Sequence, residues 1–458
     1  MARIEHIVSA VLKLIADGHI ASGQRIGSVR AAAREFGVSK NTVVEAYDRL
    51  VAQGAIEPRA GSGFFVSRPR SRAVPDARPA LIAEATDHVS LLREQLDRHY
   101  AVRVGDGRPP SDWTEGSELG RHLGYRSRAS SEPLEHGYGA PMGYEPLRVK
   151  IAQMMIERAV EVDPNQVLTT FGANHGLDLV VRHFIEPGDA VLVDSPGYYP
   201  LFGKLRLSRA TIVPVRRTLD GPDLEDLETK ARLHRPKLYF TQTLAHNPMG
   251  TSMPLATMHR VLQASERHAF GIVEDDPFAD ILPALAPRLA ALDQLRRVIY
   301  IGTFSKTLSA SLRTGFIAAS HEMIASLADV KMLSVVNSSG YVERIVHDLI
   351  ANGHYRRHLR RLQDRVARAS ETAISALRQI GFPSIRPPAG GYYLWCPLPE
   401  GIDDLELARS AAREGIFLAP GSIFNVDKTG QEPALRVNVA YATHPQFLAF
   451  LARATGQT

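Results

Sequence analysis

Polar and charged residues follow several apolar segments of the chain, at the points where buried strands would end. Lys306 closes the segment "VIYIGTFSK", Asp275 lies near the end of "FGIVEDD", and Asn247 follows "PKLYFTQT". In mostly parallel sheets, ligands collect at the carboxyl ends of the strands. A lysine placed there could form a Schiff base with an aldehyde cofactor, and a carboxylate could hold a buried, protonated ring nitrogen.

Each of these residues also has a plainer interpretation. Asp275 could be the N-cap of a helix, Lys306 taken alone would be a surface lysine, and Asn247 would be a turn residue before Pro248. Each signal alone is therefore weak, and only their combination favours a site.

A glycine-containing loop, "FGANHGL", precedes an apolar helical run from Leu177 to Phe184. Because a helix N-terminus presents free backbone N–H groups, we expect the amides of Ala173 and Asn174 to face an anion. Tyr198, in "DSPGYYP", likewise lies just past a predicted strand.

The elements that must position these residues are short strands alternating with helix-like segments. The predicted strands are "DAVLVDSP", "RATIVPVRR", "PKLYFTQT", "FGIVEDDP", "RVIYIGTFSK" and "TGFIAAS". Segments rich in valine and isoleucine that alternate with helices predict a mostly parallel sheet covered on both faces.

Length and composition narrow the class of protein. At 458 residues the chain is too long for one ordinary core, which indicates two or three domains. The start, "MARIEHIVSA", carries charges where a signal peptide has its apolar core, so we expect a cytoplasmic protein that does not bind a membrane. The single cysteine, Cys396, excludes a disulfide framework and a cysteine-based zinc site, and we expect no metal site.

The net charge of +5 belongs to one end of the chain. Residues 1–72 contain eleven Lys and Arg and six Asp and Glu, whereas the other 386 residues contain 43 of each sign. The proline-rich stretch "PRSRAVPDARP" then predicts an extended linker. We expect a first domain over residues 1–67, a linker over 68–85 and a larger domain over 86–458, with a small subdomain from about 340.

The basic N-terminal segment has the pattern of a helix-turn-helix. "IEHIVSAVLKLIADG" predicts a helix with one apolar face, and "SVRAAAREFG" and "SKNTVVEAYDRLVAQG" predict two more, with Ser39 as the N-cap of the last. "AIEPRAGSGFFV" then predicts a hairpin wing. A three-helix protein-binding module with an incidental basic surface is the alternative.

The residues that would contact DNA follow from this arrangement. Ser39, Lys40, Asn41 and Thr42 fall in the first turn of the last helix, the part that enters the groove in such motifs. Arg30, Lys40 and Arg59 would then contact phosphates or read the groove.

This stretch resembles the winged-helix domain of the GntR superfamily. The matching residues are Ser28 and Arg30 at the second helix, "GVSKNTVVEAY" at the third, and "GSGFFV", with Gly61 and Gly63, at the wing. The resemblance implies that the partner is double-stranded operator DNA.

Residues from about 110 to 458 resemble the fold type I, class I aminotransferases, which use pyridoxal 5'-phosphate. The resemblance is carried by an anion loop, an aromatic residue, an Asn-Pro turn, a strand-end Asp, a strand-end Ser-Lys and a late arginine in "LRVNVAYA". It implies that Lys306 carries the cofactor as an internal aldimine, and that Asp275 pairs with the pyridine nitrogen so that the ring can draw electrons.

The same resemblance implies roles for further residues. Asn247 would bond the ring hydroxyl, Tyr198 would stack on the ring, and Arg436 would bind the carboxylate of an amino acid as a bidentate pair. Tyr138, in "YGAPMGYEPLR", matches a family tyrosine that reaches the phosphate of the neighbouring subunit, which implies a homodimer. The phosphate would lie among Ala173, Asn174, Thr303, Ser305 and Arg313.

One departure from the family pattern concerns the cofactor ring. The family usually has a tyrosine two or three residues after the strand-end aspartate, where this chain has Pro277 and Phe278. Losing that hydroxyl should raise the pKa of the aldimine, because the tyrosine stabilises its deprotonated form. The departure puts efficient transamination in doubt, but not cofactor binding.

A GntR-type winged helix fused to an aminotransferase-like domain resembles the MocR (GabR-type) transcription regulators from end to end. The fold expected is therefore multidomain: an all-α winged helix-turn-helix with a β wing, then an α/β fold type I domain with a smaller C-terminal α+β part. The resemblance implies a regulator that senses an amino acid, an amine or the cofactor itself. A working aminotransferase that carries a DNA-binding domain is the alternative, and a cofactor-free dimerisation scaffold is a third possibility.

Overall fold

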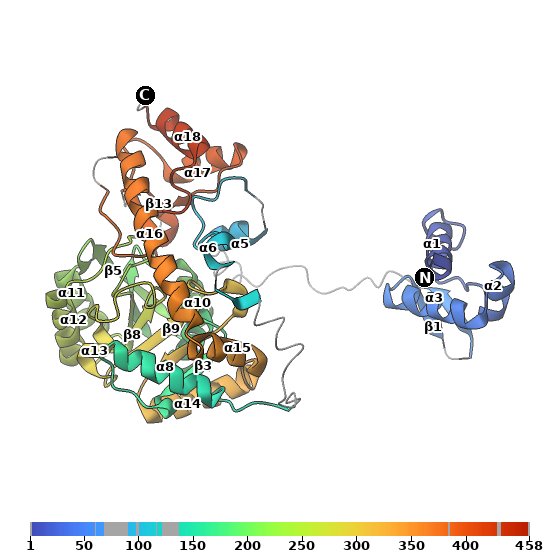
Figure 1. The fold of residues 1–458 in the computed structure, drawn as a ribbon, viewed down its shortest axis with the longest axis horizontal. Helices are drawn as coiled ribbons and strands as arrows, with labels where there is room; N and C mark the ends of the chain where they lie inside the picture. Colours follow the sequence, from blue (N-terminus) through green and yellow to red (C-terminus); the bar gives the residue numbers. More distant parts are fainter. Residues whose placement is uncertain are drawn as a thin grey trace. The chain divides into compact units, whose positions relative to one another are not determined.

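The computed structural model describes residues 2–59, 61–67, 90–97, 100–115, 117–120, 137–382, 385–427 and 432–456. The chain divides into two compact units, residues 1–78 and 79–458 (Figure 1). The predicted linker, residues 68–85, lies outside the described residues. Over the described ranges, no helix is both long and apolar enough to cross a membrane.

The first unit is the winged helix-turn-helix that the sequence predicts. Its elements are α1 (Ala2–Ala16), α2 (Val29–Glu35), α3 (Lys40–Ala52), β1 (Ile56–Arg59) and β2 (Gly63–Val66). The apolar face of α1 is buried with that of α3 in one core, which includes Ile7, Val43 and Leu50. β1 and β2 pair antiparallel, and Gly61 and Gly63 at the turn have positive φ, a conformation that favours glycine.

The second unit contains a sheet of eight strands in the order β3-β10-β9-β8-β7-β4-β5-β6. The strands are β3 (Val167–Thr170), β4 (Ala190–Ser195), β5 (Thr211–Thr218), β6 (Gly221–Pro222), β7 (Leu238–Thr241), β8 (Gly271–Asp276), β9 (Val298–Thr303) and β10 (Gly315–Ala318). Five central strands, β5, β4, β7, β8 and β9, are parallel, whereas β10 runs antiparallel to both of its neighbours. All six predicted strands are present. The sequence pattern missed β3, which has only two apolar residues, and β6, which has two residues in all.

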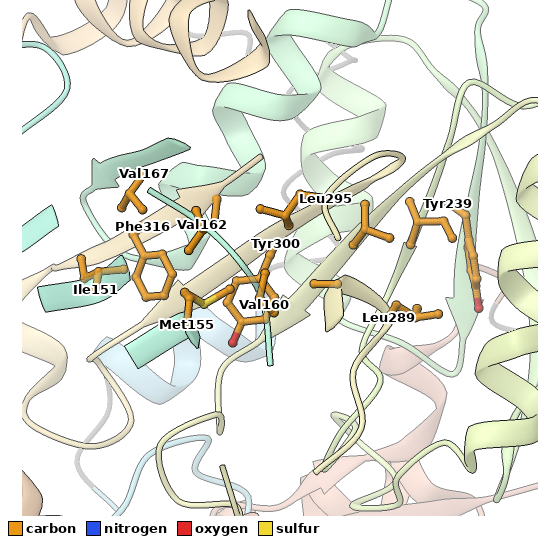
Figure 2. Packing of buried hydrophobic residues seen from close by; sticks show 14 of the residues in the cluster. Ile151, Met155, Val160, Val162, Val167, Tyr239, Leu289, Leu295, Tyr300 and Phe316 are labelled. Carbon is orange, nitrogen blue, oxygen red and sulfur yellow. The ribbon is translucent and has the colours of Figure 1, made fainter. Parts of the chain in front are cut away.

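Helices cover both faces of this sheet, as predicted. One core cluster joins the sheet to α8 (Glu145–Glu157), α11 (Leu224–His234), α12 (Leu255–His268), α13 (Leu289–Asp293) and α15 (Gly340–Ala351). A second cluster joins it to α9 (Ala173–Phe184), α10 (Tyr199–Leu207) and α14 (His321–Val335). Figure 2 shows part of the first cluster, in which Met155 of α8 packs beside Tyr300 of β9.

The start of α9 differs from the prediction. The apolar pattern begins at Leu177, but the helix begins at Ala173, so Ala173 and Asn174 are its first two residues and not part of a preceding loop. Gly172 is the N-cap and has φ +81. The first turn carries no apolar periodicity, which is why the sequence pattern starts one turn late.

A smaller α+β part follows. Its strands are β11 (Tyr393–Pro397), β12 (Ala419–Pro420) and β13 (Ala434–Asn438), in the antiparallel order β11-β13-β12, and its helices are α16 (His354–Gln379), α17 (Asp404–Arg413) and α18 (Pro445–Thr455). Val102 and Val104 from the beginning of the unit pack into its core. The remaining short elements are α5 (Ser90–Asp97), α6 (Ser111–Glu115), η1 (Pro164–Gln166), η2 (Ala310–Leu312) and η3 (Gly421–Phe424).

Candidate cofactor site and DNA-binding surface

Lys306 lies three residues beyond the end of β9. Its Nζ donates a hydrogen bond to the carbonyl oxygen of Gly107 at 2.5 Å. The hydroxyl of Tyr393, on β11, donates to the same oxygen at 2.9 Å. The amine of Lys306 therefore lies where the large sheet, the small sheet and the segment around Gly107 meet.

Asp275 is the next-to-last residue of β8, and its carboxylate is buried. Its Oδ2 accepts a hydrogen bond from Gln242 Nε2 at 2.6 Å, whereas its Oδ1 is buried and has no hydrogen-bond partner among the described residues. Burial is the main cause that raises the pKa of Asp275 to about 7, although the Gln242 hydrogen bond and the Lys306 ammonium group act in the opposite direction. The carboxylate caps no helix of the described ranges, so Oδ1 is free to accept from a ligand donor.

Asn247 and Arg436 contact one another. Arg436 Nη1 donates to Asn247 Oδ1 at 3.0 Å, and Arg436 Nη2 donates to the carbonyl of Gly105 at 2.7 Å. The guanidinium carbon lies 4.6 Å from the ring centroid of Tyr393 and 4.9 Å from that of Phe424. Arg436 is only 3% exposed, its Nε has no hydrogen-bond partner, and none of the salt bridges among the described residues involves it. A buried guanidinium without a carboxylate is costly, which makes it a natural partner for an anionic ligand.

Tyr198 follows β4 and is the N-cap residue of α10. Together with Asp275 and Gln242 it lines one small cavity. Burial raises the pKa of the Tyr198 hydroxyl well above its usual range, and the nearby Asp275 carboxylate adds to this effect. The aromatic residue and the strand-end carboxylate are thus close together, although they come from separate segments of the sequence.

The predicted anion-binding residues gather at the adjacent strand ends. Thr303 pairs with Gly315, and Gly315 pairs with Thr170, so the end of β9 lies beside the turn that leads into α9. Arg313 Nη2 donates to the carbonyl of Phe171 at 2.7 Å, and a Cβ atom at Gly172 would lie 3.0 Å from the same nitrogen.

Two more of these groups extend the arrangement. Ser305 N donates to Thr303 Oγ1 at 3.2 Å, and the side-chain oxygens of the two residues are 3.1 Å apart. The amides of Ala173 and Asn174 belong to the first turn of α9, whose N–H groups have no acceptor within the helix. Two hydroxyls, a guanidinium and a helix N-terminus therefore gather at neighbouring strand ends, and the two hydroxyl residues lie within three positions of Lys306 in the chain.

Tyr138 does not join this cluster within one chain. Its side chain is 87% exposed. It lies in a segment that approaches Asn337, because a Cβ atom at the neighbouring Gly139 would be 3.4 Å from Asn337 Nδ2.

The candidate DNA contacts lie on the surface of the first unit. Ser28 and Ser39 are the N-cap residues of α2 and α3, and their side chains accept from Ala31 N and Thr42 N at 3.2 Å. Arg30, Lys40 and Asn41 are exposed.

Arg59, on the wing, is different from the other basic candidates. It forms an ion pair with Glu57 at 2.9 Å, and its guanidinium lies over the ring of Phe65. Part of its charge is therefore already compensated.

Two protein families match the two units. Residues 3–66 match "Bacterial regulatory proteins, gntR family", and residues 106–453 match "Aminotransferase class I and II". The chain is 31% identical to the "Probable rhizopine catabolism regulatory protein MocR" of Rhizobium meliloti, over 88% of this chain and 83% of that protein. This chain belongs to the MocR/GabR-type family of transcription regulators.

Further relatives agree with this assignment. The "Uncharacterized HTH-type transcriptional regulator YjiR" of Escherichia coli (strain K12) is 28% identical over 96% of this chain and 95% of its own length. The solved structure of LysN, alpha-aminoadipate aminotransferase from Thermus thermophilus, complexed with N-(5'-phosphopyridoxyl)-L-leucine, has a TM-score of 0.72 and 28% identity. That match covers 81% of this chain and 96% of LysN.

Phe278 is, with Pro277, one of the two residues found where the family resemblance leads us to expect a tyrosine. In this MocR-type protein its ring is fully buried and contacts Tyr392 and Tyr393 edge-on, with centroids 5.4 Å away in each case. The Phe278 ring is aromatic but carries no hydroxyl that could donate a hydrogen bond.

Several residues of the MocR-type site are not indicated by the sequence pattern. Gln242 contacts Asp275, Gly107 accepts from Lys306, and Tyr393 donates to Gly107. Tyr392 donates to the backbone carbonyl of Lys306 at 2.7 Å. Only the strand-end position of Gln242, in "FTQT", offers a signal that could have indicated a role in the site.

Proposed function

We propose that this MocR-type regulator binds pyridoxal 5'-phosphate at Lys306 and responds there to an amino acid or amine by changing how it binds operator DNA. The observation that carries the proposal is the unpartnered, buried Oδ1 of Asp275, whose residue lines a cavity together with Tyr198 in the part of the chain that the structure describes. As a DNA-binding regulator it would act in the cytoplasm.

The residues fit the cofactor chemically. Asp275 Oδ1 would accept from a protonated ring nitrogen, Asn247 Nδ2 would donate to the ring hydroxyl, and the amine of Lys306 would hold the aldehyde carbon. The phosphate would lie among the hydroxyls of Thr303 and Ser305, Arg313 and the α9 N-terminus. When bound, the cofactor would supply an electron-withdrawing ring.

Arg436 is the proposed receptor for the carboxylate of an effector. Its guanidinium now donates to two neutral oxygens, those of Asn247 and Gly105. A carboxylate that took the place of the Gly105 carbonyl would form a shorter, charge-assisted bond. An effector with a carboxylate would therefore compete directly with the Gly105 carbonyl.

The segment around Gly105 offers a route by which binding could be sensed. Lys306 and Tyr393 donate to the carbonyl of Gly107, and Arg436 donates to that of Gly105. Cofactor and effector would take over Lys306 and Arg436, and the segment would lose two of its contacts. A ligand shifts a protein between states only as far as it binds them unequally, and these contacts supply such a difference.

A homodimer is part of the proposal. Around the end of α14 several large apolar side chains are exposed: Met332 by 45%, Leu333 by 87%, Val336 by 41% and Tyr341 by 49%. Tyr138, near Asn337, extends this set, which we call the α14 patch. Contiguous exposed apolar residues of this kind mark protein interfaces. A second copy bound here would place Tyr138 beside the partner.

The experiment that tests the proposal is a spectral titration. Full-length protein mixed with pyridoxal 5'-phosphate should develop a visible absorption band, and Lys306→Ala should abolish the band while leaving a folded dimer. Lys237→Ala serves as the matched control and should keep the band, because Lys237 is exposed and precedes β7, at the end of the strand opposite to the site. A colourless wild-type protein would remove the cofactor assignment.

An active aminotransferase is the second candidate. The likeness to LysN and the presence of Lys306, Asp275 and Arg436 favour it, whereas Phe278 in place of the usual tyrosine weighs against efficient turnover. Steady turnover with an amino acid and 2-oxoglutarate would favour the enzyme. A spectral change on amino-acid addition without release of a keto acid would favour the sensor.

A further inference from the structure

The side chain of Gln242 connects two of the proposed cofactor ligands. Gln242 is the first residue after β7 and is 4% exposed. Its Oε1 accepts a hydrogen bond from the backbone N–H of Asn247 at 2.7 Å, and its Nε2 donates to Asp275 Oδ2 at 2.6 Å. One amide group therefore contacts both the carboxylate proposed for the ring nitrogen and the loop that carries the asparagine proposed for the ring hydroxyl.

The orientation of this amide is determined by its partners. A backbone N–H can only donate, so the end of Gln242 that faces Asn247 must be the oxygen. The NH₂ end must then face Asp275, where it can donate only to an acceptor. This arrangement gives Asp275 Oδ2 a hydrogen-bond donor and leaves Oδ1 as the oxygen available to a ligand.

We propose that Gln242 is a positioning residue for the cofactor: its hydrogen bond favours the ionised form of Asp275, presents Oδ1 to the ring nitrogen, and keeps the Asn247 loop in place. The inference rests on the proposed function, because it assigns Gln242 a role in the same cofactor site. Gln242 acts through Asp275 and Asn247 and is not itself a catalytic residue.

Other charged and titratable groups that face Asp275 also influence its pKa. Asp276, next to it on β8, disfavours its ionisation, and Lys306, beyond β9, favours it. Tyr198, before α10, lies close enough for its own ionisation to be opposed by Asp275. If Lys306 held the cofactor, its amine would no longer have the charge and position of a free ammonium group. The hydrogen bond from Gln242 would then be the interaction that still favours the ionised form of Asp275.

Two substitutions separate the two ends of the amide. Gln242→Glu keeps an oxygen for the Asn247 N–H but removes the donor and places a second carboxyl group against Asp275. Gln242→Met removes both hydrogen bonds without adding charge. A hydrogen bond to a charged group is typically strong enough that losing it should weaken binding by about tenfold or more.

The measurement is the Kd of full-length protein for pyridoxal 5'-phosphate, from the absorption band, over a range of pH. We expect a Kd raised by about tenfold or more in both variants. For Gln242→Glu the loss should shrink at acid pH, because a proton shared between the two carboxyl groups removes their repulsion.

Gln166→Glu is the matched control for Gln242→Glu. The Gln166 amide also accepts from a backbone N–H, that of Asp163, and donates to a carbonyl, that of Ala319. Neither contact involves a residue proposed for the cofactor site. This variant should leave the Kd unchanged.

A double-mutant cycle distinguishes positioning from general damage to the fold. In an Asp275→Asn background, Gln242→Glu should cost less than about twofold, because the charged acceptor it acts on is gone. An equal loss in both backgrounds, or a wild-type Kd and pH profile in Gln242→Glu and Gln242→Met, would overturn the inference. If the wild type itself shows no band, the proposed function fails. If the wild type binds and the Gln242 variants match it, only the role of Gln242 fails.

Discussion

Replacing Asp275 by asparagine should stabilise the cofactor-free protein at alkaline pH. Asp275 is 7% exposed, and its burial raises its pKa from 3.8 to about 7. Ionisation of Asp275 therefore destabilises the folded state when no cofactor is bound. Asparagine has nearly the same shape and does not ionise, so it removes this destabilisation.

The sign and size of the effect follow from linkage. A carboxyl group whose pKa is higher in the folded than in the unfolded state stabilises folding fully below the unfolded pKa, and this contribution is lost as the pH rises towards the folded pKa. For Asp275 the pH window runs from about 4 to about 7. At about 1.4 kcal/mol per pKa unit, the loss above pH 7 amounts to at most about 4 kcal/mol. Asparagine avoids this loss, so its advantage should be near its maximum at about pH 8.5 and roughly half of that or less at about pH 5.

The assay is denaturation of the cofactor-free, full-length protein at both pH values, wild type against Asp275→Asn. The control is Asp364→Asn, an exposed carboxylate on α16 whose replacement should not change the pH dependence. With cofactor present the order should reverse, because asparagine cannot support a protonated ring nitrogen. An Asp275→Asn protein that is no more stable than the wild type at about pH 8.5, or that keeps the wild-type pH dependence, would refute the reasoning.

Two further predictions concern DNA binding and assembly. Arg30→Ala or Lys40→Ala should weaken operator binding, and the slope of log affinity against log salt should fall by about one if the lost contact is to a phosphate; wild-type affinity in both variants at matched salt would mean that another surface binds. Leu333→Asp should convert the proposed dimer into monomers in sedimentation, because it places a charge in the α14 patch. Leu285→Asp should not, because Leu285, although 80% exposed, lies between β8 and α13 and outside the α14 patch. An intact Leu333→Asp dimer would exclude the α14 patch as the interface.

Much of the fold could be predicted because its signals are local. Ser39 caps α3 in the structure as its position before the helix predicts, since capping depends only on residues three positions away. The six predicted strands carry runs of apolar residues, and their polar end residues can be read in chain order. β3 and the first turn of α9 escaped prediction because two apolar residues, or a turn without an apolar repeat, show no periodicity.

The site was predictable only as a set of residue types. Arg436 and Asn247 both followed from the family resemblance, but nothing in either segment indicates that Arg436 Nη1 donates to Asn247 Oδ1 across 189 positions of sequence. Gln242 lies in a strand-end segment that was predicted correctly, yet its role depends on where Asp275 and the Asn247 loop come to lie. For Tyr138, neither the sequence nor a single chain can show the contact, because its proposed partner is in another chain.

The order of elements, the basic winged helix and the residues at strand ends are determined by the sequence itself, because short-range backbone geometry and the spacing of apolar residues specify them. Tertiary structure alone decided that Lys306 and Gly107, 199 positions apart, share a hydrogen bond, and that Asp275 keeps one oxygen without a partner among the described residues. Such contacts depend on how separate segments pack at the end of the sheet. This packing depends on contacts between residues far apart in the sequence, so no single segment of sequence specifies it.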